Sequence, residues 1–82
     1  MENNGYHLSH IEKGILGEFS KIEEEFWEAK DALRQENPIM VLTELSDLLG
    51  AMKEYLKKYN MSLVDLEKMQ QATERAFKNG RR

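Results

Sequence analysis

The chain has 82 residues, of which 40% are hydrophobic and 33% charged, so its length and composition indicate one small globular domain. With 12 Lys and Arg against 15 Asp and Glu the net charge is −3, which excludes an ordinary basic nucleic-acid-binding surface. The absence of cysteine excludes disulfides and cysteine-ligated zinc, and no stretch approaches the ~20 apolar residues of a membrane span or forms a signal core, so we expect a cytoplasmic protein.

The first predicted helix runs from about Ser9 to about Gln35. Its apolar residues alternate spacings of three and four, which places them on one stripe: Leu8, Ile11, Ile15, Phe19, Ile22, Phe26, Ala29 and Leu33. Ser9 and Glu12 fit a capping box at the helix start. Gly14 and Gly17 each cost up to ~1 kcal/mol relative to alanine, so the first turns are expected to bend or the helix to begin later.

Two further helices follow, each with a start signal. Asn37 is a good N-cap and Pro38 suits a first helical position, which predicts a second helix to about Lys58. Ser62 and Asp65 fit a capping box for a third helix, which is predicted to end near Lys78 at the Asn79-Gly80 stop signal.

These patterns predict an all-α fold, in which three helices form an antiparallel protomer. Residues 1–82 are expected to be one helical domain, with residues 1–8 flexible or loosely packed. Because so short a chain buries only roughly 60% of its unfolded surface, we expect oligomerisation to complete a four-helix-type core.

Four glutamates surround two aromatic residues in the first helix. At ~100° per residue, Glu25 lies beside the apolar stripe and Glu28 a little further round the same flank. Glu24 lies further still, and Glu23 falls on the opposite flank. Because Glu25 and Glu28 are one helical turn apart, their carboxylates are able to converge.

Glu44 and Asp47 form a second pair with the same spacing on the second helix. The two pairs lie at similar distances from the turn at Pro38, so antiparallel packing would bring all four carboxylates to one space, and the small Ala51 would leave room beside them. Such crowded negative charge favours a divalent cation, and oxygen ligands suit Mg²⁺ or Mn²⁺. The alternative is a solvated acidic face, which is common on helices of an acid-rich chain.

The two acid pairs together resemble a known signature. Glu24-Glu25-Phe26-Trp27-Glu28, fifteen further residues and then Glu44-Leu45-Ser46-Asp47 are similar to the E-E-x-x-E … E-x-x-D motif of the MazG-like nucleoside triphosphate pyrophosphohydrolases, of the all-α NTP pyrophosphatase superfamily. Ile11-Glu12-Lys13-Gly14 also matches the context before the first motif, and the resemblance spans roughly residues 11–82.

The resemblance implies hydrolysis of an NTP or dNTP between its α- and β-phosphates, by a homodimer or homotetramer. By position, Glu25, Glu28, Glu44 and Asp47 would hold Mg²⁺, with Mn²⁺ as an alternative ion. Glu24 would orient or deprotonate the attacking water, or act through a further ion. A helical oligomerisation or interaction module that keeps the acidic motif without turnover is the alternative function.

Other residues have two interpretations each. Phe26 fits the core, whereas Trp27 fits a base-stacking platform or a subunit contact. Lys68, Arg75 and Lys78 line one side of the third helix, where they would reach phosphates across a dimer or form a solvated face. Lys13 is a weaker phosphate-binding candidate. His7 and His10 are expected to be exposed and without a role, although a histidine pair can bind metal adventitiously. Neither nucleic acid nor a membrane is an expected partner.

Overall fold

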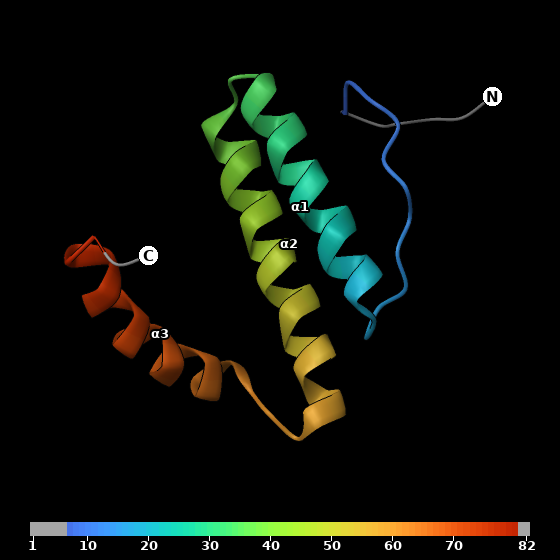
Figure 1. The fold of residues 1–82 in the computed structure, drawn as a ribbon. Coiled ribbons are helices and arrows are strands. Elements are labelled where there is room, and N and C mark those ends of the chain that lie inside the picture. Colours follow the sequence, from blue (N-terminus) through green and yellow to red (C-terminus); the bar gives the residue numbers. More distant parts are fainter. Residues whose placement is uncertain (1–6, 81–82) are drawn as a thin grey trace.

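The computed structural model describes residues 7–80, which form two long helices packed as a hairpin and a third that leaves it (Figure 1). Helices α1 (Phe19–Arg34) and α2 (Pro38–Leu56) lie antiparallel and in contact along their length. A short 3-10 turn, η1 (Lys57–Tyr59), leads to α3 (Leu63–Lys78). Because residues 7–80 contain three α-helices and no strand, the predicted all-α class is confirmed.

The predicted signals for the second and third helices are confirmed. The Asn37 side chain accepts a hydrogen bond from the Met40 N–H at 3.1 Å, and Pro38 takes the first helical position. The Ser62 N–H donates to the Asp65 carboxylate at 2.8 Å in the capping box of α3. The second helix ends as regular α-helix at Leu56, slightly before the predicted end, and tightens into η1.

The predicted start of the first helix near Ser9 is wrong, whereas the later start expected from Gly14 and Gly17 is confirmed, because α1 begins at Phe19. Residues 7–18 instead form an irregular segment that runs beside α1 (Figure 1). Gly17 adopts φ 95°, a left-handed conformation that interrupts a helix. The segment obtains hydrogen-bond acceptors from α1, since the Gly14 N–H donates to Glu24 Oε1 at 2.7 Å.

The predicted capping box of Ser9 and Glu12 is therefore also wrong. Ser9 Oγ donates to Asp31 Oδ1 at 3.3 Å and accepts from Arg34 Nη2 at 3.1 Å. Both partners lie in the last turns of α1, so Ser9 fastens the N-terminal segment to that helix.

The interior of the hairpin is made of small and acidic residues. Its buried members are Ala29, Ala32 and Ala51 together with Glu24, Glu25, Glu28, Asp31 and Glu44. Phe19 and Leu33, by contrast, are 55% and 64% exposed. Phe26 is 47% exposed, so its predicted core position is not found within one protomer. The acidic flank of α1 is therefore buried, whereas the large residues Phe19, Phe26 and Leu33 of its apolar stripe are exposed.

Helix α3 diverges from the hairpin and contacts α2 but not α1 (Figure 1). None of its residues is buried, and Met69 and Phe77 on its apolar side are 58% and 60% exposed. Covering these faces by self-association remains a prediction. No helix within residues 7–80 has the length and apolar character needed to cross a bilayer.

A pair of glycine variants tests the close packing of the N-terminal segment. A Cβ atom on Gly14 would overlap the backbone of Ser20 at the start of α1, whereas a Cβ on Gly50 in the middle of α2 meets no atom within 4 Å. We expect Gly14→Ala to lower the free energy of unfolding by about 1–3 kcal/mol, because the segment must move away from Glu24.

The matched control, Gly50→Ala, should raise the free energy of unfolding by up to about 1 kcal/mol through helix propensity. Urea unfolding of both variants measures the two effects. Equal effects of the two substitutions would contradict the packing of residues 7–18 against α1.

Candidate metal centre

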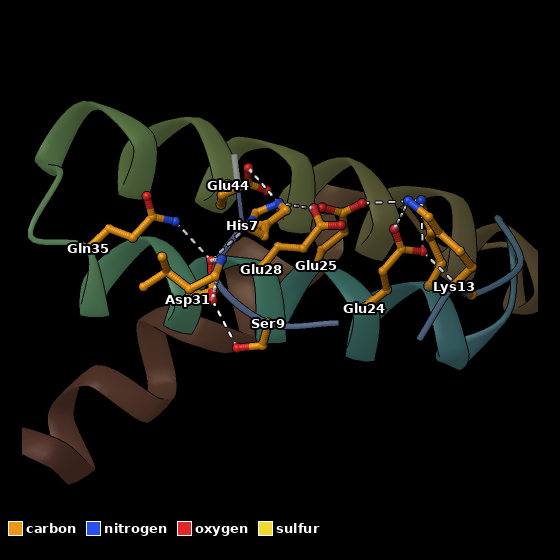
Figure 2. Close-up of polar contacts among 12 residues, drawn as sticks. His7, Ser9, Lys13, Glu24, Glu25, Glu28, Asp31, Gln35 and Glu44 are labelled. Atoms are coloured by element: carbon orange, nitrogen blue, oxygen red, sulfur yellow. Dashed lines mark hydrogen bonds and ion pairs between the residues drawn. The ribbon is translucent and has the colours of Figure 1, made fainter. Parts of the chain in front are cut away.

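The two predicted acid pairs meet between α1 and α2. Ligand oxygens of Glu25, Glu44 and Asp47 all lie within 4.8 Å of one another, and so do those of Glu24, Glu25 and Glu28. Figure 2 shows the side chains of Glu25, Glu28 and Glu44 pointing toward one another from the two helices. The predicted convergence of the two pairs is therefore present in the fold, although Asp47 is exposed where the three glutamates are buried.

Burial and neighbouring carboxylates change the ionisation of Glu28. Burial, followed by hydrogen bonding to Glu44 and the charge of Glu25, raises the pKa of Glu28 to about 8 from its ordinary value of 4.5. Without a cation, the cluster therefore keeps a proton at neutral pH. A divalent cation would replace that proton, because it stabilises the ionised carboxylates.

The donor set fits a hard divalent cation. Glu25 is only 6% exposed, yet within residues 7–80 no hydrogen-bond donor reaches its buried Oε2 atom. Such an orphaned acceptor is costly unless a ligand satisfies it. Because the surrounding ligand atoms of Glu28, Glu44 and Asp47 are carboxylate oxygens, Mg²⁺ or Mn²⁺ matches the set.

Glu24 lies at the edge of the cluster beside two lysines. Lys21 Nζ lies 3.1 Å from Glu24 Oε1 and 3.2 Å from Glu25 Oε1, and Lys13 Nζ lies 3.7 Å from Glu24 Oε2 (Figure 2). Burial alone would raise the pKa of Glu24, but the N–H of Gly14 and the ammonium of Lys21 hold it below the ordinary value. Glu24 is thus a carboxylate at neutral pH that already accepts hydrogen bonds.

A second set of contacts lies toward the other end of the cluster, around Asp31. This fully buried carboxylate accepts hydrogen bonds from the Leu8 N–H at 2.9 Å and from the Gln35 side chain at 2.9 Å, and it lies 3.1 Å from His7 Nδ1 (Figure 2). Burial would raise the pKa of Asp31, but these hydrogen bonds hold it below its ordinary value. The side chain of His7 is 11% exposed, so the expectation that His7 is exposed is wrong.

Trp27 lies outside the cluster, on the surface of α1. It is 51% exposed and meets Phe26 edge-on at a ring separation of 5.4 Å. Both rings line a shallow apolar groove of about 420 Å³ that α2 completes with Leu48 and Met52. The groove is compatible with either predicted role of Trp27, base stacking or subunit contact.

The predicted phosphate-binding residues are dispersed. Lys13 is 84% exposed and lies beside Glu24, so the structure brings it to the cluster. Lys68, Arg75 and Lys78 are exposed on α3, which has no contact with α1, and Lys78 pairs with Glu74 at 3.3 Å. Within this protomer the α3 residues are not brought to the acids, and their role across a dimer remains a prediction.

Three residues near the cluster were not singled out as site residues from sequence. Lys21 precedes Glu24 and Glu25 by three and four positions, and Asp31 follows Glu28 by three, so helical spacing could have identified both. His7 reaches the cluster through the irregular segment, and no periodic signal marks that contact.

Measurements of stability at several pH values test whether Glu28 keeps a proton. The raised pKa of Glu28 means that the folded metal-free protein binds a proton more tightly than the unfolded chain does. The stabilising contribution is complete below about pH 4.5 and is lost as pH rises through about 8. In metal-free buffer, we expect the unfolding free energy of Glu28→Gln to fall less over this range than that of the wild-type protein.

Glu23→Gln is the matched control, since Glu23 is exposed on the same helix. Urea unfolding at several pH values in a chelating buffer gives the three curves. Parallel curves for the wild-type protein and Glu28→Gln would show that Glu28 holds no such proton.

Comparison of the chain with protein-family models, with curated proteins and with solved structures gives no significant match. The resemblance to the MazG-like pyrophosphohydrolases therefore rests on the motif and its context. The geometry of the acid cluster is a separate observation that does not depend on it.

Proposed function

We propose that the chain is a Mg²⁺-dependent nucleoside triphosphate pyrophosphohydrolase that cleaves an NTP or dNTP between the α- and β-phosphates. The observation that carries the proposal is the meeting of Glu25, Glu44 and Asp47 from two helices, with a buried oxygen of Glu25 that lacks a donor within residues 7–80. The resemblance of both acid pairs to the E-E-x-x-E … E-x-x-D motif supports the reaction class.

In this proposal, different side chains bind the cation, orient the attacking water and contact the phosphate. Glu25, Glu28, Glu44 and Asp47 hold the cation, which when bound neutralises phosphate charge and polarises a water molecule. Glu24 orients the attacking water, because it stays ionised beside Lys21 and accepts hydrogen bonds. Lys13, which is exposed next to Glu24, contacts a phosphate in this proposal.

A homodimer or homotetramer would complete the base pocket. The apolar groove beside Trp27 is open to solvent in one protomer. Large apolar side chains are exposed on all three helices: Phe19, Phe26, Leu45, Leu49 and Phe77. Burial of these side chains against a second copy would stabilise the assembly by about 25 cal/mol per Å² of apolar surface. In this assembly, α3 of the second copy would bring Lys68, Arg75 and Lys78 to the NTP or dNTP substrate. We propose that the protein acts in the cytoplasm.

Two isosteric variants test whether the carboxylates are needed for pyrophosphate release. Glu28→Gln and Asp47→Asn each remove one charged ligand, so we expect pyrophosphate release to fall to background in both. A panel of NTPs and dNTPs with millimolar Mg²⁺, monitored for pyrophosphate, measures turnover and identifies the substrate.

Glu36→Gln should keep wild-type turnover, because Glu36 is exposed in the turn between α1 and α2 and belongs to none of the candidate metal-binding groups within residues 7–80. Circular dichroism of all variants separates loss of chemistry from loss of fold. Unchanged pyrophosphate release by well-folded Glu28→Gln would exclude the proposed role of the cluster.

The second candidate function is a helical interaction module without turnover. The observation that favours it is the large exposed apolar surface of all three helices, which suits association as well as it suits a base pocket. Metal dependence distinguishes the two functions, because a module has no need of a cation.

Thermal melting with and without Mg²⁺ makes this distinction. A ligand bound only by the folded state at 100 times its dissociation constant stabilises by about 2.7 kcal/mol, so we expect a clear rise in Tm with millimolar Mg²⁺ and little rise for Glu28→Gln. An unchanged Tm of the wild-type protein would favour the interaction module.

A further inference from the structure

We propose that His7 is a nitrogen ligand of the metal centre and binds an ion together with Glu28 and Glu44. This inference rests on the proposed carboxylate site and adds a residue that the acidic motif does not contain. It also predicts that a transition-metal ion such as Mn²⁺ is preferred over Mg²⁺ at this end of the cluster.

The distances around His7 fit ligands that share one ion. His7 Nε2 lies 3.8 Å from Glu28 Oε2 and 3.9 Å from Glu44 Oε1, too far for hydrogen bonds. Two ligand atoms at ~2.1 Å from an ion are about 3.0 Å apart at right angles and about 4.2 Å apart across it. The observed separations lie inside this range, and the three residues form one of the candidate metal-binding groups.

Asp31 orients the imidazole for this role. His7 Nδ1 lies 3.1 Å from Asp31 Oδ2, and Asp31 is fully buried among hydrogen-bond donors from the N-terminal segment and α1. With the proton on Nδ1 donated to Asp31, Nε2 presents its lone pair toward Glu28 and Glu44 (Figure 2). A carboxylate that holds the far nitrogen of a histidine is the usual second partner of a metal-bound imidazole.

A separate observation indicates that the adjoining space receives a cation. Glu25, which shares candidate groups with both Glu28 and Glu44, has a buried Oε2 that no donor within residues 7–80 contacts. Lys21 lies on the Oε1 side of Glu25, at 3.2 Å, and does not satisfy Oε2. Within residues 7–80, the buried Oε2 of Glu25 is therefore an acceptor that a bound cation would satisfy.

The ligand set determines the kind of ion. Carboxylate oxygens suit both Mg²⁺ and Mn²⁺, but Mg²⁺ takes oxygen ligands almost alone, whereas first-row transition-metal ions also accept imidazole. Two carboxylates with one imidazole therefore favour a borderline transition metal. Because His7 belongs to the segment of residues 7–18, the bound ion would also tie that segment to both helices of the hairpin.

Electron spin-echo spectroscopy of the Mn²⁺-loaded protein tests the proposal directly, because a bound imidazole nitrogen modulates the echo. The wild-type protein should show nitrogen modulation, which His7→Ala should remove and His10→Ala should keep, since His10 is three residues away and exposed. Titration should show Mn²⁺ affinity reduced at least about 10-fold in His7→Ala, with a much smaller change for Mg²⁺.

Circular dichroism melts show whether His7→Ala is folded. If that variant is unfolded, the electron spin-echo spectra of the wild-type protein and of His10→Ala test the proposal. Tight Mn²⁺ binding without nitrogen modulation in the wild-type protein would overturn the role of His7 and leave the carboxylate site standing. No Mn²⁺ binding at all would overturn both this inference and the proposed function.

Discussion

Ionisable carboxylates are packed inside a two-helix hairpin, and their burial determines which side chains the two helices leave exposed. Glu24, Glu25, Glu28 and Glu44 are more deeply buried than Phe19 or Phe26, although burying uncompensated charge is strongly unfavourable. The structure relieves the cost in different ways along the cluster. Lysine side chains and a backbone N–H stabilise the ionised form of Glu24, whereas the raised pKa of Glu28 keeps that carboxyl protonated at neutral pH. In our proposal a divalent cation replaces that proton.

With the acids inside, the large residues Phe19, Phe26 and Leu33 of the α1 apolar stripe are exposed. Trp27 and Phe26 line a groove on the outer face, while α3 projects from the hairpin without contacting α1. The arrangement separates a metal centre inside one protomer from the apolar surface that we propose subunits use to build a base pocket. The N-terminal segment covers a further side of α1. Asp31 and Glu24 accept hydrogen bonds from its backbone N–H groups, which in a helix would donate to backbone carbonyls.

Periodicity and capping signals predicted the three helices and the height match between the acid pairs, because both depend on neighbours along one helix. They failed at the start of α1, where Gly17 and long-range acceptors outweigh an apolar pattern that continues through Ile11 and Ile15. They also placed Phe26 in a core that one protomer does not form. His7 could not have been found from spacing, since its partners lie 24 residues away at Asp31 and beyond. The proposed reaction rests on the motif, and the geometry adds only that acidic groups from both helices lie close enough to hold a metal ion.

Anomalous X-ray scattering from crystals grown with Mn²⁺ tests whether an ion binds between α1 and α2, because it locates the ion independently of turnover. We expect a strong anomalous peak between the two helices, within about 2.3 Å of carboxylate oxygens from both, including Glu25 and Glu44. Well-diffracting crystals in which this space gives no anomalous signal, or in which Mn²⁺ binds only at surface acids, would contradict this expectation.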